Sequence, residues 1–540
     1  MTLRVILTSA ALAVCLTSFG AQAQVAESAP AAAALPAPRL IFSEQEMALA
    51  QAVARKPGLA AFYGTNGLKP IFTGAEGAAR RTALIAAVAR APEHGLPMQR
   101  YQAVTLADLN RDAPDAADTE LTFAEVFARW THDVSGGVVD PRKIDPSIKR
   151  VVIRTPTNEL LHEYATTGDP AATLARIEPH DARYIALQNA LGGKTDLIAP
   201  PGTVEVPAGL WKIGAVGEGV VALRERLAVM GFDAGQPEVA ATIFDAPLAQ
   251  AVADFQARAG LKADGVAGAG TIARLNRKQV GGDKGVLIAL ERMRWMNGLD
   301  LNQRMVWVNL PEFNARIVDG GHEVFETRTV IGKSTEDRMT PEFSDEMEHI
   351  VVNPRWNVPR SITVKEYLPR LQGNRNAVSQ IDIVDNRGNV IPRDRIDFGK
   401  YTAANFPYRM RQKPSDDNAL GLVKFIFPNP WNIYLHDTPT KHLFDQSARA
   451  YSHGCIRIGR PFDLAYELLN GQVADPQATF QRALDSKRET WLPLKPHLPV
   501  HLVYFTTFPD ENGTIHRYKD VYGRDEAVYG ALMRAGVEKF

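Results

Sequence analysis

The sequence predicts a multi-domain α+β protein, because the spacing of its apolar residues changes along the 540-residue chain. Residues 43–200 repeat apolar side chains every three or four positions, as helices do. Residues 205–278 hold three short helical patterns separated by glycine-containing turns. After residue 305 the repeat falls to two, which is typical of strands. We therefore expect a helical scaffold, a small three-helix bundle and a mainly β domain with a lid insertion.

The first residues have the pattern of an export signal. A positive start is followed by an apolar run at residues 5–20, and Ala21-Gln22-Ala23 has the small-x-small pattern of a signal peptidase site. An uncleaved anchor is the alternative, but the run is shorter than the roughly 20 residues of a spanning helix. We expect a signal peptide at 1–23, an Ala/Pro-rich linker at 24–42 and a soluble protein in the periplasm.

Composition argues against two classes of partner. Lysine plus arginine number 61 and aspartate plus glutamate also number 61, whereas nucleic-acid binding usually requires a basic excess. The chain has no glycine-rich phosphate-binding motif, so a nucleotide cofactor is not expected.

One thiol would remain after export, because the chain has only two cysteines, Cys15 in the leader and Cys455. His453 and Gly454 directly precede Cys455, and His436 lies 19 residues before it. A thiol with a neighbouring imidazole to take its proton is the basis of cysteine nucleophilic catalysis. We expect the imidazole to supply thiolate at neutral pH. A buried, inert cysteine is the alternative.

The residues around the thiol also suit acyl chemistry. Gly454 allows a sharp turn, so that backbone N–H groups could face an incoming carbonyl as an oxyanion hole. The apolar runs 433–435 and 456–458 predict adjacent strands, which would bring His436 next to Cys455. Tyr434 would then share a strand face with His436; a place in the core is its alternative.

An insertion at 361–420 interrupts the strand pattern. It contains a short helical segment at 364–371, a hairpin at 381–391 and a basic, aromatic patch at 408–413. Insertions of this size beside a site are often lids that exclude water. The alternative is a solvated surface decoration.

The bundle resembles the peptidoglycan-binding domain type 1, which implies docking to the cell wall; a bundle without a binding role is the alternative. The matching residues are Leu223, Arg224, Arg226, Leu227, Gly231, Phe244, Asp245, Leu248, Ala251, Val252, Phe255, Gln256, Gly260, Leu261, Asp264, Gly265, Val266 and Gly268.

The thiol stretch resembles the active-site signature of the L,D-transpeptidase (YkuD) catalytic domain. The resemblance rests on His436, its separation of 19 residues from Cys455, the run Ser452-His453-Gly454-Cys455, and Arg457. Together with the bundle, the chain is similar to the large YcbB-type members. Further matches are Glu291-Arg292-Met293-Arg294-Trp295, Asn353-Pro354, Trp356-Asn357-Val358-Pro359, Asn418-Ala419-Leu420-Gly421 and Phe427-Pro428-Asn429-Pro430; Ser415-Asp416-Asp417 departs from the Gly-Pro of many relatives.

The resemblance implies roles for eight residues. Cys455 would be the nucleophile and His436 its proton acceptor and donor, oriented by a nearby carbonyl such as that of Asp437. His453 and Gly454 would shape the oxyanion site. Substrate would contact Arg457, Tyr434, Ser452 and Trp356. For Arg457, an ion pair inside the fold is the alternative to a substrate carboxylate.

The resemblance also implies the reaction. Cys455 would attack the bond between an L-centred diamino acid and D-alanine in a peptidoglycan stem peptide, leaving a thioester. An amine of a second stem would resolve it into a 3→3 cross-link, which contributes to cell-wall organisation and cell shape. Water or an envelope-protein amine are alternative acceptors. Neither a metal nor another cofactor is required.

Two rivals lie outside this class. His436, His442, His453 and Cys455 could be counted as metal ligands, but their spacing matches no usual zinc pattern. A non-catalytic wall-binding scaffold is the other rival.

The expected order of parts is a signal peptide at 1–23, a linker at 24–42, a scaffold at 43–200, a peptidoglycan-binding domain at 205–278, a linking helix at 283–300, a catalytic domain at 301–510 with a capping insertion at 361–420, and a C-terminal segment at 511–540.

Overall fold

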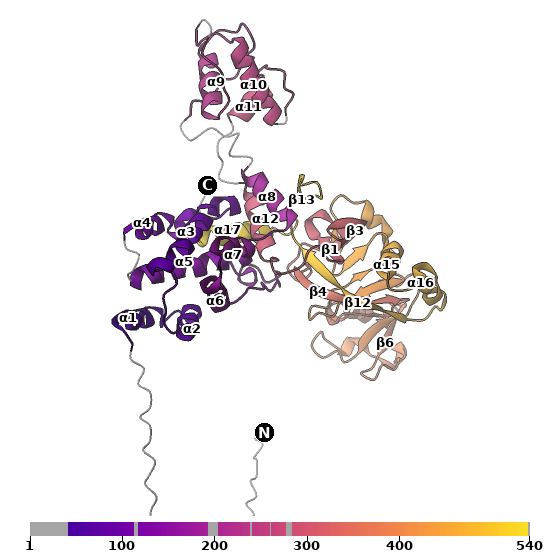
Figure 1. Cartoon of the computed structure of the whole chain (residues 1–540). Helices are drawn as coiled ribbons and strands as arrows, with labels where there is room; N and C mark the ends of the chain where they lie inside the picture. The colour runs from indigo at the N-terminus through magenta and orange to yellow at the C-terminus, as the bar shows by residue number, and fades with distance from the viewer. Residues whose placement is uncertain are drawn as a thin grey trace, which may run out of the picture.

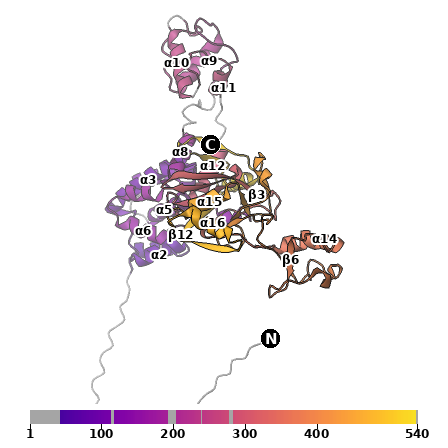
Figure 2. The ribbon, with the colours of Figure 1, turned by 90° about the vertical axis from the view of Figure 1, so that its right-hand side faces the viewer.

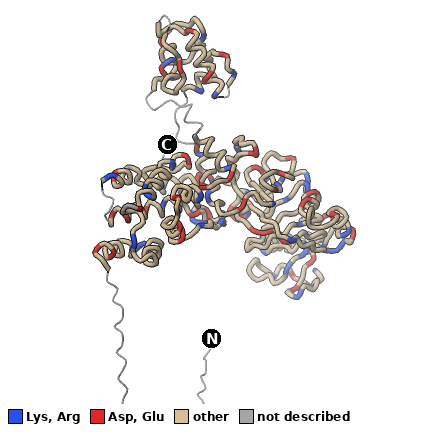
Figure 3. Tube along the Cα trace, viewed as in Figure 1, with Lys and Arg blue, Asp and Glu red and all other residues tan. Residues whose placement is uncertain are grey.

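The computed structural model describes residues 42–112, 117–192, 203–237, 240–259, 261–276 and 283–537 (Figure 1). The expected leader at 1–23, Cys15 and nearly all of the linker at 24–42 lie outside the described residues. Among the helices that are described, none combines the length and hydrophobicity needed to cross a membrane. Positive and negative residues are interspersed along the chain trace, in keeping with their equal numbers (Figure 3).

The N-terminal region is helical, as the sequence predicts. Ser43 caps its first helix by accepting a hydrogen bond from the backbone of Glu46, whose carboxylate bonds back to the Ser43 backbone. Phe62, Phe123 and Trp130 are fully buried in its core. The helices are α1 (Glu44–Val53), α2 (Pro57–Thr65), α3 (Gly74–Ala89), α4 (Ala103–Asp112), α5 (Ala117–Gly136), α6 (Thr157–Thr166), α7 (Pro170–Ile177) and α8 (Ala182–Gly192).

Two distant helices complete this helical core. They are α12 (Lys284–Arg294), in the expected linking segment, and α17 (Arg524–Arg534), near the C-terminus. Val528 and Leu532 of α17 lie in the same apolar cluster as Phe62. The helical scaffold therefore includes a segment from beyond the β domain, for which the sequence predicted no structure.

Residues between the scaffold and α12 form a separate three-helix bundle of α9 (Glu218–Val229), α10 (Ala246–Arg258) and α11 (Ala269–Leu275). The buried amide of Gln256 explains part of the sequence motif. It accepts hydrogen bonds from the backbone of Asp264 (3.0 Å) and of Gly265 (2.9 Å) and donates to the Val266 carbonyl (3.0 Å). These bonds fix the turn that precedes α11.

The β domain is built on a nine-stranded mixed sheet in the order β10-β3-β11-β9-β8-β4-β12-β1-β2. Because β2 also pairs with β3, the sheet closes on itself. Helices α15 (Pro461–Leu469) and α16 (Pro476–Asp485) pack against it through Leu464 and Phe480. The strands are β1 (Met305–Asn309), β2 (Asn314–Asp319), β3 (His322–Gly332), β4 (Phe343–Val352), β8 (Val423–Ile426), β9 (Leu435–His436), β10 (Ala450–Ser452), β11 (Ile456–Ile458) and β12 (Thr490–Val503); β13 (Thr507–Pro509) and β14 (Ile515–Arg517) form a separate pair.

The insertion forms a cap with its own core, which Figure 2 shows projecting from the β domain. Its sheet has the order β5 (Trp356–Asn357), β7 (Arg409–Gln412) and β6 (Ile381–Val384), so the expected basic patch is a central strand. The expected hairpin closes only through a Val384–Val390 bridge. The helical segment runs through α13 (Arg360–Ile362), a π-helical turn (Thr363–Tyr367) and α14 (Leu368–Gly373). This arrangement confirms the predicted fold class.

Candidate active site

Strand pairing brings the thiol and the imidazole to one face of the sheet. As predicted, β9 and β11 are neighbours; they are parallel, with His436 opposite Arg457. Side chains alternate along a strand, so Tyr434 and His436 share a face with Cys455 and Arg457. All four line one cleft of about 880 Å³, which also contains Trp356. The sulfur and the ring therefore meet at a space large enough for a peptide.

His436 is held with one ring nitrogen available. Its Nδ1 lies 2.5 Å from the carbonyl oxygen of Asp437, and a carbonyl can only accept, so Nδ1 carries the hydrogen and Nε2 has a free lone pair. Burial, and then the positive charge of Arg457, lowers the pKa of His436 to about 3. The imidazole is therefore neutral at physiological pH and can accept a proton.

The Cys455 thiol is also neutral at rest. Burial raises its pKa to about 11, although hydrogen bonds from Tyr434 and the charge of Arg457 oppose the increase. The thiol donates to the Asn432 carbonyl, with 3.4 Å between sulfur and oxygen. This differs from the expected supply of thiolate at neutral pH, because desolvation outweighs the neighbouring positive charge.

Asn432 and Asn429 belong to one loop, of which sequence reasoning matched only Phe427-Pro428-Asn429-Pro430, without assigning it a role. Asn432 has a left-handed backbone with φ of 55°, which asparagine tolerates better than most residues. The Asn429 side chain accepts from the Ile433 backbone (3.1 Å) and donates to the carbonyl of Ile433 (2.7 Å). Asparagines in a Pro-rich stretch are a usable sequence signal for such a turn.

The turn before the thiol is fixed by local hydrogen bonds. Gly454 has φ of 120°, a conformation that favours glycine, and a Cβ there would lie 3.3 Å from Ile433. The Ser452 hydroxyl donates to the Cys455 carbonyl (2.5 Å) and accepts from the Gly454 N–H (3.0 Å). Thr340 donates to the Gly454 carbonyl at 2.7 Å. Both the Ser452 hydroxyl and the Gly454 N–H are thus used within the protein.

His453 faces the cap. Its Nε2 lies 2.7 Å from Glu366 of the π-helical turn, and Arg338 donates to the same carboxylate oxygen at 2.9 Å. Sequence reasoning missed Glu366 and Arg338. No sequence pattern marks them, because the contact joins three segments that are far apart in the chain.

Arg457 points into the cleft with part of its guanidinium unsatisfied. It donates to the Thr440 hydroxyl at 3.0 Å, but its buried Nε has no hydrogen-bond partner. Among the described residues it forms no ion pair with a carboxylate, which was the alternative to substrate binding. Beside it, the Trp356 side chain hydrogen-bonds to Tyr434, and burial raises the Tyr434 pKa. In the part of the chain that the structure describes, no group of three or more His, Cys, Asp or Glu residues could hold a metal ion.

Comparisons with known proteins match three parts of the chain. Residues 303–483 match the L,D-transpeptidase catalytic domain (YkuD), residues 216–275 match a family described as "Putative peptidoglycan binding domain", and residues 57–191 match a scaffold domain. A relative from Haemophilus influenzae named "Putative L,D-transpeptidase" is 36% identical over 210 residues, which cover 38% of this chain and 42% of that protein.

Among solved structures, the L,D-transpeptidase (residues 123–326) from Xylanimonas cellulosilytica is 16% identical and covers 56% of this chain and 100% of that one, with a TM-score of 0.14. A likeness of that size does not bear on the fold. The family matches coincide with the capped β domain, the bundle and the helical region. The chain therefore carries an L,D-transpeptidase catalytic domain of the YkuD family together with a peptidoglycan-binding domain and a scaffold domain.

Proposed function

We propose that the protein is a peptidoglycan L,D-transpeptidase that forms 3→3 cross-links through a thioester on Cys455. The observation that carries this proposal is the placement of the Cys455 thiol and the neutral His436 imidazole on one face of a large cleft. The proposal includes export to the periplasm, where the peptidoglycan-binding bundle would hold the enzyme against the cell wall.

In the first half-reaction, the Cys455 sulfur attacks the carbonyl that joins the L-centred diamino acid to D-alanine. His436 Nε2 takes the thiol proton during the attack, because neither group is ionised beforehand. The tetrahedral intermediate then expels D-alanine, whose amine takes the proton from the imidazolium. A thioester remains on Cys455.

The oxyanion that forms in this step needs hydrogen-bond donors. The Gly454 N–H is already bonded to Ser452, so we assign the role to the Cys455 N–H and the Tyr434 hydroxyl, which hydrogen-bonds to the thiol. Gly454 and Ser452 shape the turn that aims this N–H. Arg457 would bind a donor carboxylate, and its unsatisfied Nε supports this role.

In the second half-reaction, an amine of a second stem attacks the thioester. His436 takes a proton from that amine and returns it to the departing sulfur, so the enzyme is regenerated with a new amide bond. Water in place of the amine would give a carboxypeptidase, and an amine of an envelope protein would tether that protein to the wall. The family match to a catalytic domain favours these enzymes over a non-catalytic wall-binding scaffold.

A carbapenem tests the nucleophile directly, because it acylates the same sulfur. Intact-mass measurement should show one added drug mass on the wild type and none on Cys455→Ala. His436→Gln should acylate at least about a hundredfold more slowly while remaining folded, since it loses its general base. Equal labelling of wild type and Cys455→Ala would refute the thioester.

Mass spectrometry of digested wall material from a Cys455→Ala strain then identifies which linkage disappears, and thus the acceptor.

A further inference from the structure

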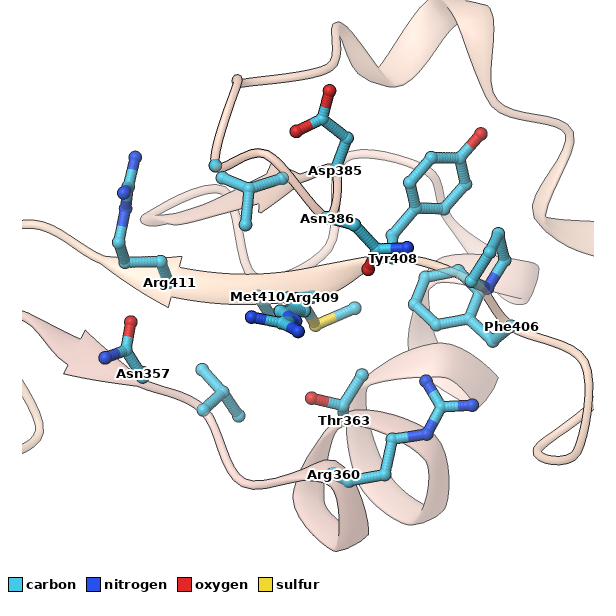
Figure 4. Close-up of a pocket in the computed structure, with 14 residues that line it drawn as sticks. Asn357, Arg360, Thr363, Asp385, Asn386, Phe406, Tyr408, Arg409, Met410 and Arg411 are labelled. Atoms are coloured by element: carbon cyan, nitrogen blue, oxygen red, sulfur yellow. The ribbon is translucent and has the colours of Figure 1, made fainter. Parts of the chain in front are cut away.

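The cap contains a second cavity, of about 620 Å³ (Figure 4), whose lining shares three residues with the lining of the thiol cleft. Asn357, Val358 and Arg360 line both spaces. A molecule bound in the cap cavity would therefore lie beside a molecule bound at Cys455, with only this short segment between them.

Three guanidinium groups surround the cap cavity, from Arg360, Arg409 and Arg411. Arg409 and Arg411 lie two positions apart on β7, so they project from the same face of the strand, and the buried Met410 between them also lines the cavity. Arg409 is exposed and Arg411 is half-buried. The strand thus contributes two cations to the wall of the cavity.

These cations are not neutralised by the fold. Among the ion pairs of residues 283–537, none involves Arg409 or Arg411, and Asp382, which faces Arg411 across the sheet, pairs instead with Lys413 at 3.3 Å. The buried Nε of Arg411 has no hydrogen-bond partner. A buried N–H of a cation without an acceptor is costly, and a bound anion would satisfy it.

The carboxylate on the cavity wall, that of Asp385, is already hydrogen-bonded within its own turn. It accepts from the backbone N–H groups of Arg387 (2.8 Å) and Asn389 (2.9 Å) and from the Asn389 amide. An aromatic pair also lines the cavity: Phe406 and Tyr408 pack edge to face with 5.5 Å between ring centroids. The cavity therefore combines excess positive charge, amide groups and an aromatic wall.

We propose that this cavity binds the carboxylates of the second stem peptide, the one whose amine resolves the thioester. A stem peptide presents carboxylates along an extended backbone, and paired guanidiniums bind carboxylates by forked, charge-assisted hydrogen bonds. The side chains of Asn357 and Asn386 on the wall suit peptide groups. Because the first stem peptide occupies the cleft with Arg457, the adjoining cap cavity is the space left for the second stem peptide. This inference rests on the proposed function, of which it specifies the acceptor.

The test uses the full-length protein with Arg409 and Arg411 both changed to Gln. The matched control carries Arg375→Gln and Arg395→Gln, which remove two exposed cap cations that do not line either space. A tetrapeptide donor and a tripeptide acceptor are supplied, and cross-linked dimer is measured against acceptor concentration. We expect the apparent KM for acceptor to rise about tenfold or more in the cavity variant and to stay unchanged in the control.

Two further readouts make the result specific. Release of D-alanine with donor alone should keep its KM, because that step does not use the cavity. An acceptor with amidated carboxylates should bind the wild type about as poorly as the cavity variant binds the normal acceptor, and amidation should have no further effect in the variant. An unchanged acceptor KM, an equal rise in donor KM, or insensitivity to amidation would each overturn the proposal.

Binding alone separates this inference from the proposed function. Calorimetric titration of the tripeptide into the wild type and the cavity variant needs no thioester chemistry. Weaker binding by the variant would support the site even if no D-alanine were released by any form of the protein. Equal binding, or equal competition by inorganic phosphate in both proteins, would reject it even if the transpeptidase reaction were demonstrated.

Discussion

At the scale of single residues, the reacting pair is arranged so that no charge exists before substrate arrives. Burial disfavours the thiolate form of Cys455. Burial and the positive charge of Arg457 both disfavour the protonated form of His436. Ionisation of either group would place a charge in a poorly hydrated site. In the proposed mechanism, the proton therefore moves only when attack on a carbonyl makes the sulfur less basic.

This arrangement predicts a flat pH profile. Protonation of His436 requires a fall toward pH 3, and ionisation of Cys455 requires a rise toward pH 11. The rate of acylation by a carbapenem should therefore vary less than about twofold between pH 5 and pH 9. Rapid-mixing measurements across that range check it. A rate that climbs through a midpoint near pH 6 or 7 would instead indicate a preformed thiolate–imidazolium pair.

The sequence predicted this pair but not its state of charge. Spacing and chemistry were enough for His436 and Cys455, because strand pairing reliably brings such runs together. Their pKa values depend on burial, which a cap assembled from distant segments imposes. Ser452 illustrates the same limit: its residue type suits substrate contact, yet its hydroxyl is used within the turn.

At the scale of elements, one turn of the cap helix contacts the thiol loop. Glu366 receives hydrogen bonds from His453 and Arg338. Burial raises the pKa of Glu366, but its bond from His453 and the Arg338 charge outweigh this, so the net pKa is lowered. The carboxylate is thus a fixed anion that joins the cap to the loop before Cys455.

Glu366→Gln should loosen the cap without unfolding it. Amide hydrogen exchange in residues 360–373 should accelerate, because a charge-assisted contact becomes a weaker neutral one. Donor KM should rise severalfold while the melting temperature changes little. Asp394→Asn, at an exposed cap position, is the control. Unchanged exchange in residues 360–373 would show that this contact does not hold the cap.

Sequence periodicity predicted the β character of the chain after residue 305 and the strands at 433–435 and 456–458, but less of the cap. The basic patch at 408–413 showed no alternation strong enough to predict β7, and its partner β6 lies more than twenty residues earlier. The cap core also begins at Trp356, before the expected start of the insertion at 361. Non-local pairing of short strands leaves little trace in a single sequence.

At the scale of the whole molecule, a buried carboxylate joins the helical scaffold to the β domain. Glu342, directly before β4, bonds to Arg292 of α12 (2.6 Å) and Arg524 of α17 (2.9 Å). All three side chains are almost completely buried. Loss of the anion would leave Arg524 without its ion-pair partner and Arg292 with the more distant Asp525, at 3.9 Å.

Glu342→Gln should therefore destabilise the fold by about 3 kcal/mol or more, the usual cost of breaking a buried ion pair from one side. Denaturant unfolding followed by tryptophan fluorescence measures the change. Glu346→Gln, four residues further along the chain with an exposed side chain, should alter stability by less than about 0.5 kcal/mol. Similar losses in the two variants would contradict the central position of Glu342.

A second interface residue should make the protein sensitive to acid. Burial and the charges of Arg150 and Arg183 lower the pKa of His501 to about 3. The unfolded chain then binds a proton that the folded chain does not, so stability is lost as pH falls from about 6.5 toward 3, by up to about 1.4 kcal/mol per pH unit. His501→Gln should reduce this slope in pH-dependent unfolding. An unchanged slope would mean that His501 titrates normally.

The position of α17 has a consequence for biosynthesis. Val528 and Leu532 belong to the same apolar cluster as residues from the N-terminal helices. In sequence, the entire β domain is therefore inserted between two parts of the scaffold. As the polypeptide is synthesised, part of the surface of its first helices stays uncovered until some four hundred further residues have followed. The closed sheet needs β12 and the scaffold needs α17, so both parts can be completed only when the last fifty or so residues of the chain are available.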